Sequence, residues 1–212
     1  GFINPPVIEN VINIEQVLPA LNEGIENSTV ILPLDANLPQ EYLILENRQQ
    51  IGSDQYLIKS GLLVWHIDET ITSMYPVLNA VNVNPDFYGV NLIQADGVGD
   101  LYKSTGRADM NDPYPGNLNI TEITSITHPQ ISSYSYDKNA DGRIEPGTNS
   151  EIEISNIIEE SNNLITFKLT NPNKQGHIIS FDTGFKGNAF SGSDQLQWAG
   201  ILFTAVDTAL LS

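Results

Sequence analysis

The stretch YDKNADGRIEPG, residues 136–147, places oxygen-bearing side chains at alternating positions of a short loop. Calcium takes about six to eight oxygen ligands, and a turn with this spacing directs successive oxygens at one centre. Gly142 would provide the sharp turn that such a loop needs at its sixth position. The candidate ligands, in loop order, are Asp137, Asn139, Asp141, the carbonyl of Arg143, and Glu145.

The end of this loop differs from an EF-hand. Thr148 stands where an EF-hand has a bidentate glutamate, and Glu145 is followed directly by Pro146 and Gly147. We therefore expect a shorter structural calcium loop between β-strands, which Glu145 closes early. The alternative is a turn rich in Asp and Asn whose side chains cap their own backbone.

A second group of acidic residues lies in two other turn sequences. Asp96 and Asp100 belong to ADGVGDL, whereas Asp109 and Asp112 belong to DMNDPYPG. If the two loops converge, their carboxylates would bind a second calcium ion. The alternative is that Asp and Gly are present because turns favour them.

His66 and Asp68 lie two residues apart in WHIDE, so on a strand they face the same side. They would share a metal ion or a hydrogen bond there. The alternative is the polar face of a strand end that meets a neighbouring domain, with Leu63, Trp65 and Ile67 filling the opposite, core face.

Composition limits the classes of partner. The chain has 212 residues, of which 26 are acidic and 9 basic, giving a net charge of -17. Such a charge repels phosphate backbones and anionic lipid but attracts divalent cations. We therefore expect no nucleic-acid and no membrane partner.

Two further features of the composition are informative. The absence of cysteine rules out disulfides and thiolate-bound zinc. The chain does not begin with methionine, so we expect it to be a fragment or a processed piece of a longer protein.

Short apolar runs rich in β-branched residues, separated by Asn, Asp, Gly and Pro, predict strands and turns. Residues 12–21 leave two alternatives open: Ile14, Val17, Leu18 and Leu21 have helical spacing, whereas Pro19 and the Asn-rich flanks oppose a helix. The predicted strands are 29–34, 41–49, 61–68, 89–95, 151–159, 163–170, 177–182 and 199–205.

These strands predict an all-β fold of two parts. Residues 1–171 form an antiparallel, jelly-roll-like β-sandwich. Pro, Gly and polar residues in LTNPNKQG, residues 169–176, predict a boundary after it. Residues 172–212 then form a linker and the truncated start of a second β-sandwich module.

Four sequence blocks resemble the immune inhibitor A family of secreted bacterial zinc metallopeptidases, in the order in which that family has them. The first block, EYLILENRQQIGSDQYLIKSGLLVWHIDE, is similar to the one that follows the family's zinc motif. The others are YGVNLIQADGVGDL, DMNDPYPG, and the region of ITHPQISSYS and NNLITFKLT. The resemblance covers about residues 1–170.

The resemblance implies a β portion of a calcium-dependent metalloendopeptidase, secreted or on the bacterial cell surface. The family's zinc centre is His-Glu-x-x-His, but His66, His128 and His177 are never four residues apart. The resemblance therefore implies that zinc would bind only in the missing catalytic part. We expect this chain alone to carry no catalytic residues and to show no peptidase activity. Its partners would be that catalytic part and a protein or peptide substrate. The alternative is an extracellular adhesion or carbohydrate-binding module.

Overall fold

The computed structural model describes the chain in several segments that together build one all-β unit. It has two antiparallel sheets and almost no helix. The described residues are 5–21, 27–35, 40–74, 81–103, 106–137, 142–144, 147 and 150–172.

In the part of the chain that the structure describes, the regular structure consists of seven strands, one short helix and two 3-10 turns. In chain order they are β1 (Val11–Leu18), β2 (Thr29–Pro33), β3 (Glu41–Arg48), η2 (Gly52–Asp54), β4 (Gly61–Asp68), α1 (Glu69–Met74), β5 (Val90–Leu92), η3 (Asp100–Tyr102), β6 (Glu153–Glu159) and β7 (Ile165–Asn171).

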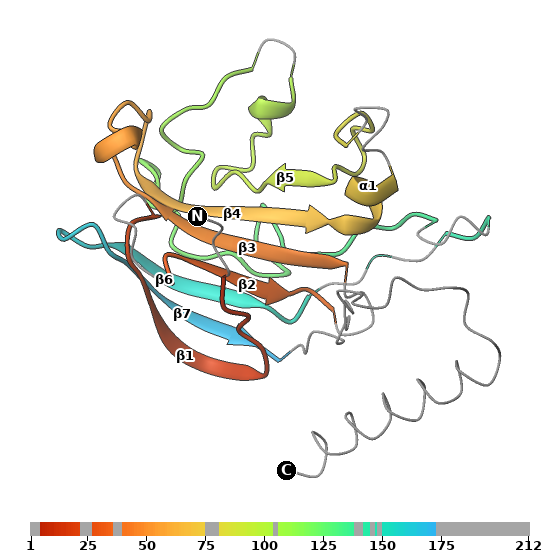
Figure 1. Cartoon of the computed structure of the whole chain (residues 1–212), viewed down its shortest axis with the longest axis horizontal. Helices are drawn as coiled ribbons and strands as arrows, with labels where there is room; N and C mark the ends of the chain where they lie inside the picture. The colour runs from red at the N-terminus through yellow and green to blue at the C-terminus, as the bar shows by residue number, and fades with distance from the viewer. Residues whose placement is uncertain are drawn as a thin grey trace, which may run out of the picture. The chain divides into compact units, whose positions relative to one another are not determined.

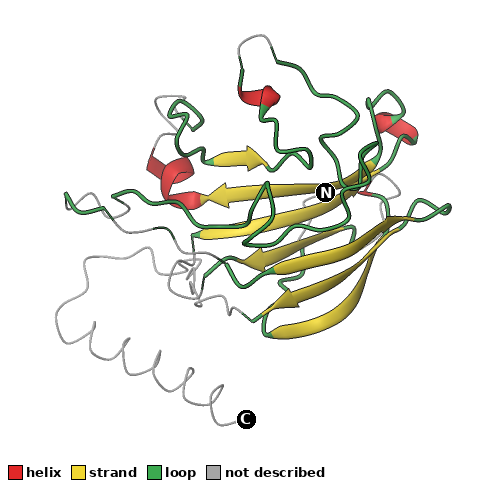
Figure 2. Cartoon of the chain, turned by 180° about the vertical axis from the view of Figure 1, so that it is seen from behind, coloured by secondary structure: helices red, strands yellow, loops and turns green. Residues whose placement is uncertain are grey.

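The strands form a four-stranded sheet, in the order β2-β3-β4-β5, and a three-stranded sheet, in the order β1-β7-β6. Figure 1 shows the two sheets with β5 at one margin and β1 at the other. Figure 2 shows that loops account for most of the chain around the strands. The architecture is sandwich-like, as the sequence predicts.

Alternation of side chains explains why these segments are strands that share a core. Along β3, every second residue from Glu41 to Asn47 is buried, and the residues between them are half-buried. The inner faces of both sheets contribute to one apolar cluster. From the four-stranded sheet come Val30, Leu32, Leu43, Leu45, Leu62 and Val64, and from the three-stranded sheet Leu18, Ile154, Ile157, Ile165, Phe167 and Leu169.

A bulge in β6 keeps both of its core isoleucines inside. The register with β7 shifts between Ser155 and Ile158. Asn156 lies in the bulge with φ 52°, a left-handed conformation that asparagine tolerates better than most residues. Ile154 and Ile157, three residues apart, therefore both face the core, whereas Ile158 is exposed.

Residues 11–18 form strand β1, so the helix considered for residues 12–21 does not form, and this strand is not among those predicted from the sequence. β1 pairs with β7 along its length, from Val11 opposite Asn171 to Leu18 opposite Ile165. The helical spacing of its apolar residues is misleading because Ile14 and Val17 are exposed. Only Leu18 in this strand is buried, so tertiary pairing decides its structure.

Asn47 joins the two sheets inside the core. Its side chain is fully buried, and its Nδ2 donates hydrogen bonds to the carbonyls of Leu18 (2.7 Å) and Asn163 (2.8 Å). Gln49 Nε2 donates to Asn47 Oδ1 at 2.7 Å. Because Leu18 is in β1 and Asn163 lies in the β6–β7 turn, one amide ties β3 to the opposite sheet.

The predicted strands at 29–34, 41–49, 61–68, 89–95, 151–159 and 163–170 each correspond to an observed strand, although β5 is shorter than expected. The strands predicted at 177–182 and 199–205 lie outside the described residues. The boundary at 169–176 and the second module stay predictions. Within the described residues, no helix has both the length and the apolar character needed to span a bilayer.

Removing the Asn47 amide should weaken the sandwich. Asn47→Ala removes the donor from the buried Leu18 carbonyl and from the partly buried Asn163 carbonyl, and we expect the free energy of unfolding to fall by about 1–3 kcal/mol. Gln50→Ala is the control, because Gln50 is exposed and donates to only one carbonyl, that of Leu57. Urea unfolding of both variants measures the difference. Equal losses would show that Asn47 does not tie the sheets.

Candidate functional site

The inner face of the β3–β4 hairpin becomes polar at one end. Glu41 pairs with Asp68 and Leu43 with His66 in the antiparallel register. Glu41, His66 and Asp68 are at most 3% exposed, although the rest of this inner face is largely apolar. Buried carboxylates require donors, so their hydrogen bonds show what this end of the sheet does.

Asp68 connects the hairpin to helix α1 and to a distant loop. Its Oδ1 accepts hydrogen bonds from the backbone N–H groups of Thr70 (2.9 Å) and Ile71 (3.2 Å), as an N-cap residue does. Its Oδ2 accepts a hydrogen bond from the Tyr136 hydroxyl at 2.8 Å. Burial raises the pKa of Asp68 and nearby Glu41 raises it further, against the lowering effect of the Tyr136 hydrogen bond.

Glu41 and His66 both contact the loop segment 131–136. Glu41 Oε1 accepts a hydrogen bond from the backbone N–H of Tyr134 at 2.9 Å. His66 Nε2 lies 3.6 Å from that oxygen, beyond hydrogen-bond distance. The rings of His66 and Tyr134 are tilted by 37° with centroids 4.3 Å apart. The segment 131–136 therefore covers the polar end of the inner face.

The expected placement of the WHIDE side chains is correct in its alternation and wrong in its direction. His66 and Asp68 do share one face, but that face is the inner one, together with Leu62 and Val64. Leu63, Trp65 and Ile67 are half-buried on the other face. The reason is that segment 131–136 supplies donors to the buried carboxylates, which lets polar residues occupy the inner face.

The loops that carry the second acidic group lie together. The backbone N–H of Ala95 donates to the Asp112 carbonyl at 2.8 Å. Asp112 Oδ2 accepts from the backbone N–H of Asp109 at 2.6 Å, and Asp96 Oδ1 accepts from that of Val98 at 2.9 Å. These contacts bring residues 94–100 and 109–112 into one cluster, called the acidic loop cluster below.

Three oxygens of the acidic loop cluster are buried and have no hydrogen-bond donor among the described residues. They are Oδ1 of Asp100, Oδ1 of Asn111 and Oδ1 of Asp112. Asp112 is 4% exposed, and burial raises the pKa of its carboxyl. The charges of Asp100, Asp109 and Asp96 raise this pKa further, whereas the hydrogen bond from Asp109 lowers it. The cluster therefore presents oxygen ligands and excess negative charge to any bound cation.

Carboxylate and imidazole side chains do not form a complete metal site among the described residues, and this holds for the acidic loop cluster as well. Across the described residues, no three His, Asp or Glu side chains are grouped tightly enough to hold a metal ion. His66 and Asp68 do not bond to each other, because the Asp68 oxygens accept from α1 and from Tyr136. In the acidic loop cluster, two carboxylates and one amide supply the unpartnered oxygens.

The first predicted calcium loop is described only in part. The backbone N–H of Gly142 donates to Asp137 Oδ2 at 2.8 Å, and Gly142 has φ 84°, the sharp turn expected there. Both a calcium loop and a self-capping turn would contain this bond. Asn139, Asp141 and Glu145 lie outside the described residues, so the calcium site at residues 137–145 stays a prediction.

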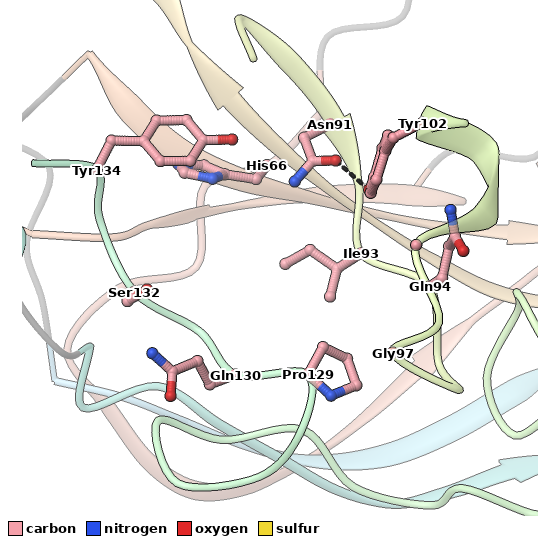
Figure 3. Close-up of a pocket in the computed structure, with 11 residues that line it drawn as sticks. His66, Asn91, Ile93, Gln94, Gly97, Tyr102, Pro129, Gln130, Ser132 and Tyr134 are labelled. Carbon is pink, nitrogen blue, oxygen red and sulfur yellow. Dashed lines mark hydrogen bonds between the residues drawn. The ribbon is translucent and has the colours of Figure 1, made fainter. Parts of the chain in front are cut away.

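A polar pocket of about 230 Å³ lies beside the polar end of the β3–β4 hairpin and beside the acidic loop cluster. Figure 3 shows it between the β4–β5 edge, with His66 and Asn91, and the covering segment, with Gln130 and Tyr134. Gln94 connects the pocket to the acidic loop cluster, because its Oε1 accepts from the backbone N–H of Asp100 at 3.1 Å.

Several residues of this site are not among the candidates that the sequence motifs indicate. Glu41 alternates with Leu43 and Leu45, so its place on the inner face was available from strand periodicity. The side of the sheet on which Asn91 lies follows from the same alternation along the predicted strand 89–95. Tyr134 and Tyr136 carry no such signal, since they belong to an irregular segment whose position depends on tertiary contacts.

Comparison with known proteins returned no family model, no curated protein and no solved structure that matches this chain. The roles of the acidic loop cluster and of the polar pocket are therefore inferred from their own residues.

The raised pKa of Asp68 predicts how pH affects stability. In the unfolded chain Asp68 titrates near its ordinary value of 3.8, whereas in the folded chain its pKa is higher. Its contribution to folding is thus fully present below the unfolded pKa and is lost as pH rises through the folded pKa. The stability of the wild type relative to Asp68→Asn, which keeps an oxygen to cap α1, should fall as the pH rises above about 4.

The melting temperatures of the wild type and of Asp68→Asn, measured at a series of pH values, test this loss of stability. Asp86→Asn, at an exposed aspartate outside the hairpin, is the matched control, and its difference from the wild type should stay flat. A wild-type advantage over Asp68→Asn that grows with pH would contradict the expected sign.

Proposed function

We propose that this chain is a non-catalytic, calcium-stabilised β portion of a secreted bacterial zinc metallopeptidase of the immune inhibitor A type. In that protein this chain supports the substrate cleft, and the zinc site belongs to a preceding part of the same protein. Calcium neutralises loops that the net charge of -17 otherwise forces apart.

The observation that carries this proposal is the set of unpartnered buried oxygens in the acidic loop cluster. A buried carboxylate oxygen without a donor is costly, and native structures rarely keep one without an ion, a water molecule or a function. Oδ1 of Asp100, Asn111 and Asp112 has the hard oxygen chemistry that calcium prefers. One calcium ion bound by these oxygens would offset both the desolvation and the repulsion.

The arrangement of the resembling blocks supports the same proposal. The first block forms the β3–β4 hairpin, and the second forms β5 and the loop after it. The third block lies against both: Leu62 and Tyr114 exchange backbone hydrogen bonds of 2.8 and 2.9 Å, and Ala95 donates to Asp112. Blocks that resemble one family in sequence are therefore neighbours in space.

Calcium should raise the melting temperature of the wild-type chain relative to a chelator. A ligand at about 100 times its dissociation constant stabilises by about 2.7 kcal/mol, which corresponds to about 5–10 °C for a domain of this size. In Asp112→Asn this shift should shrink. Without calcium that variant should be at least as stable as the wild type, because it loses a buried charge but can still accept from Asp109.

Two further variants make this test specific. Asp141→Ala separates the predicted loop at residues 137–145 from the acidic loop cluster, and Asp86→Asn controls for the loss of one exposed charge. No calcium shift in the wild type would refute calcium stabilisation altogether. A shift that Asp112→Asn leaves intact and Asp141→Ala abolishes would place calcium in the other loop.

The peptidase assignment has its own test, which does not depend on calcium. The coding sequence before Gly1 should encode a His-Glu-x-x-His motif, and the protein that includes it should cleave casein in the presence of zinc. The present chain alone should leave casein intact. An upstream sequence without that motif would reject the peptidase assignment.

An extracellular adhesion or carbohydrate-binding module is the second candidate function. The polar pocket beside β5 favours it, because a purely supporting scaffold has no need of one. The two candidates also differ in what precedes the chain.

A further inference from the structure

The polar pocket occupies the margin of the four-stranded sheet, where β5 is only three residues long. One wall comes from β4 and β5 with the loop after them, and the other from residues 129–134. Figure 3 shows the side chains of both walls around a common space. Its volume of about 230 Å³ is below the about 300–1,000 Å³ of sites for drug-sized ligands, so it fits a smaller molecule.

Two buried polar atoms of this pocket lack a hydrogen-bond partner. Gln94 and His66 are each 3% exposed, and both line the pocket. Among the described residues, neither Nε2 atom has a hydrogen-bond partner, although His66 Nε2 lies 3.6 Å from Glu41 Oε1. Native structures normally satisfy such atoms, so we expect a partner other than the described residues.

The polar groups of the pocket are held in place by the chain. The Tyr102 hydroxyl contacts both Asn91 Oδ1 and the Leu92 carbonyl, and its single proton is donated to one of these two acceptors. Figure 3 shows the Asn91 nitrogen turned away from Tyr102. Gln94 is fixed by the backbone N–H of Asp100, and the Tyr134 ring packs on His66. Groups ordered in advance cost less entropy when a ligand binds.

The lining is polar without fixed charge. Amide and hydroxyl side chains line it, and no Asp, Glu, Lys or Arg among the described residues does so. A cation finds no carboxylate there, and an anion finds no Lys or Arg side chain while facing a strongly negative protein. The pocket therefore selects neutral ligands that both donate and accept hydrogen bonds.

We propose that this pocket binds one neutral sugar ring, as the terminal unit of a glycan. Sugar hydroxyls both donate and accept, which matches amides such as Gln94 and Gln130 and the hydroxyl of Ser132. The apolar face of a sugar ring packs on aromatic rings, and Tyr102 is 41% exposed at the pocket. The site would attach the protein to glycosylated surfaces, independently of calcium stabilisation.

The test is binding of neutral sugars to the full chain at saturating calcium. Saturation-transfer NMR with glucose, galactose, mannose, N-acetylglucosamine and N-acetylgalactosamine should identify at least one ligand. Gln130→Ala should weaken that binding about five- to tenfold, the effect of losing one hydrogen bond. Gln130 is exposed, so the fold should tolerate this change. Gln55→Ala, at an exposed glutamine outside the pocket, should bind normally.

Ser132→Tyr provides a blocking variant, because a bulky ring at this half-buried position fills the space, and it should abolish binding. Gln130→Ala decides the test by itself if the blocking variant does not fold. The proposal is overturned if none of the five sugars binds, if Gln130→Ala binds as tightly as the wild type, or if tri-alanine binds in their place with the same sensitivity to Gln130→Ala.

Discussion

Two buried carboxylates, side by side on neighbouring strands, set the conditions for the rest of this structure. Glu41 and Asp68 face inward at the end of the β3–β4 hairpin, where an apolar core would reject them. Each is stabilised by donors from elsewhere in the chain: helix α1 and Tyr136 for Asp68, and the Tyr134 backbone for Glu41. Their need for donors thus fixes segment 131–136 on the sheet, although that segment has no regular structure of its own.

This placement of segment 131–136 also creates the pocket. The segment crosses the inner face at the β4–β5 edge, where the short β5 leaves the sheet margin open. Tyr134 covers His66 on one side, and Tyr102 fixes Asn91 on the other. The two walls are held by hydrogen bonds and by ring packing, and together they enclose a cavity lined by both polar and apolar side chains.

The acidic loop cluster is a different solution to the same problem of buried charge. At Asp68 the chain itself supplies the donors, whereas Asp100 and Asp112 each keep one buried oxygen without a donor. Gln94 joins the cluster to the pocket through the Asp100 backbone. Ordering of the cluster by a cation would therefore also steady one wall of the pocket.

The sequence by itself determined the all-β class, the hairpin and most strand positions, because alternation of side chains along a strand is a local property. It also placed His66 and Asp68 on one face and Asp96 through Asp112 in turns. Only the tertiary structure decided which face is the inner one, that residues 11–18 are a strand, and that Tyr134, Tyr136 and Gln94 belong to the site. These features depend on contacts between residues far apart in the chain, such as Tyr136 with Asp68, which no local pattern records.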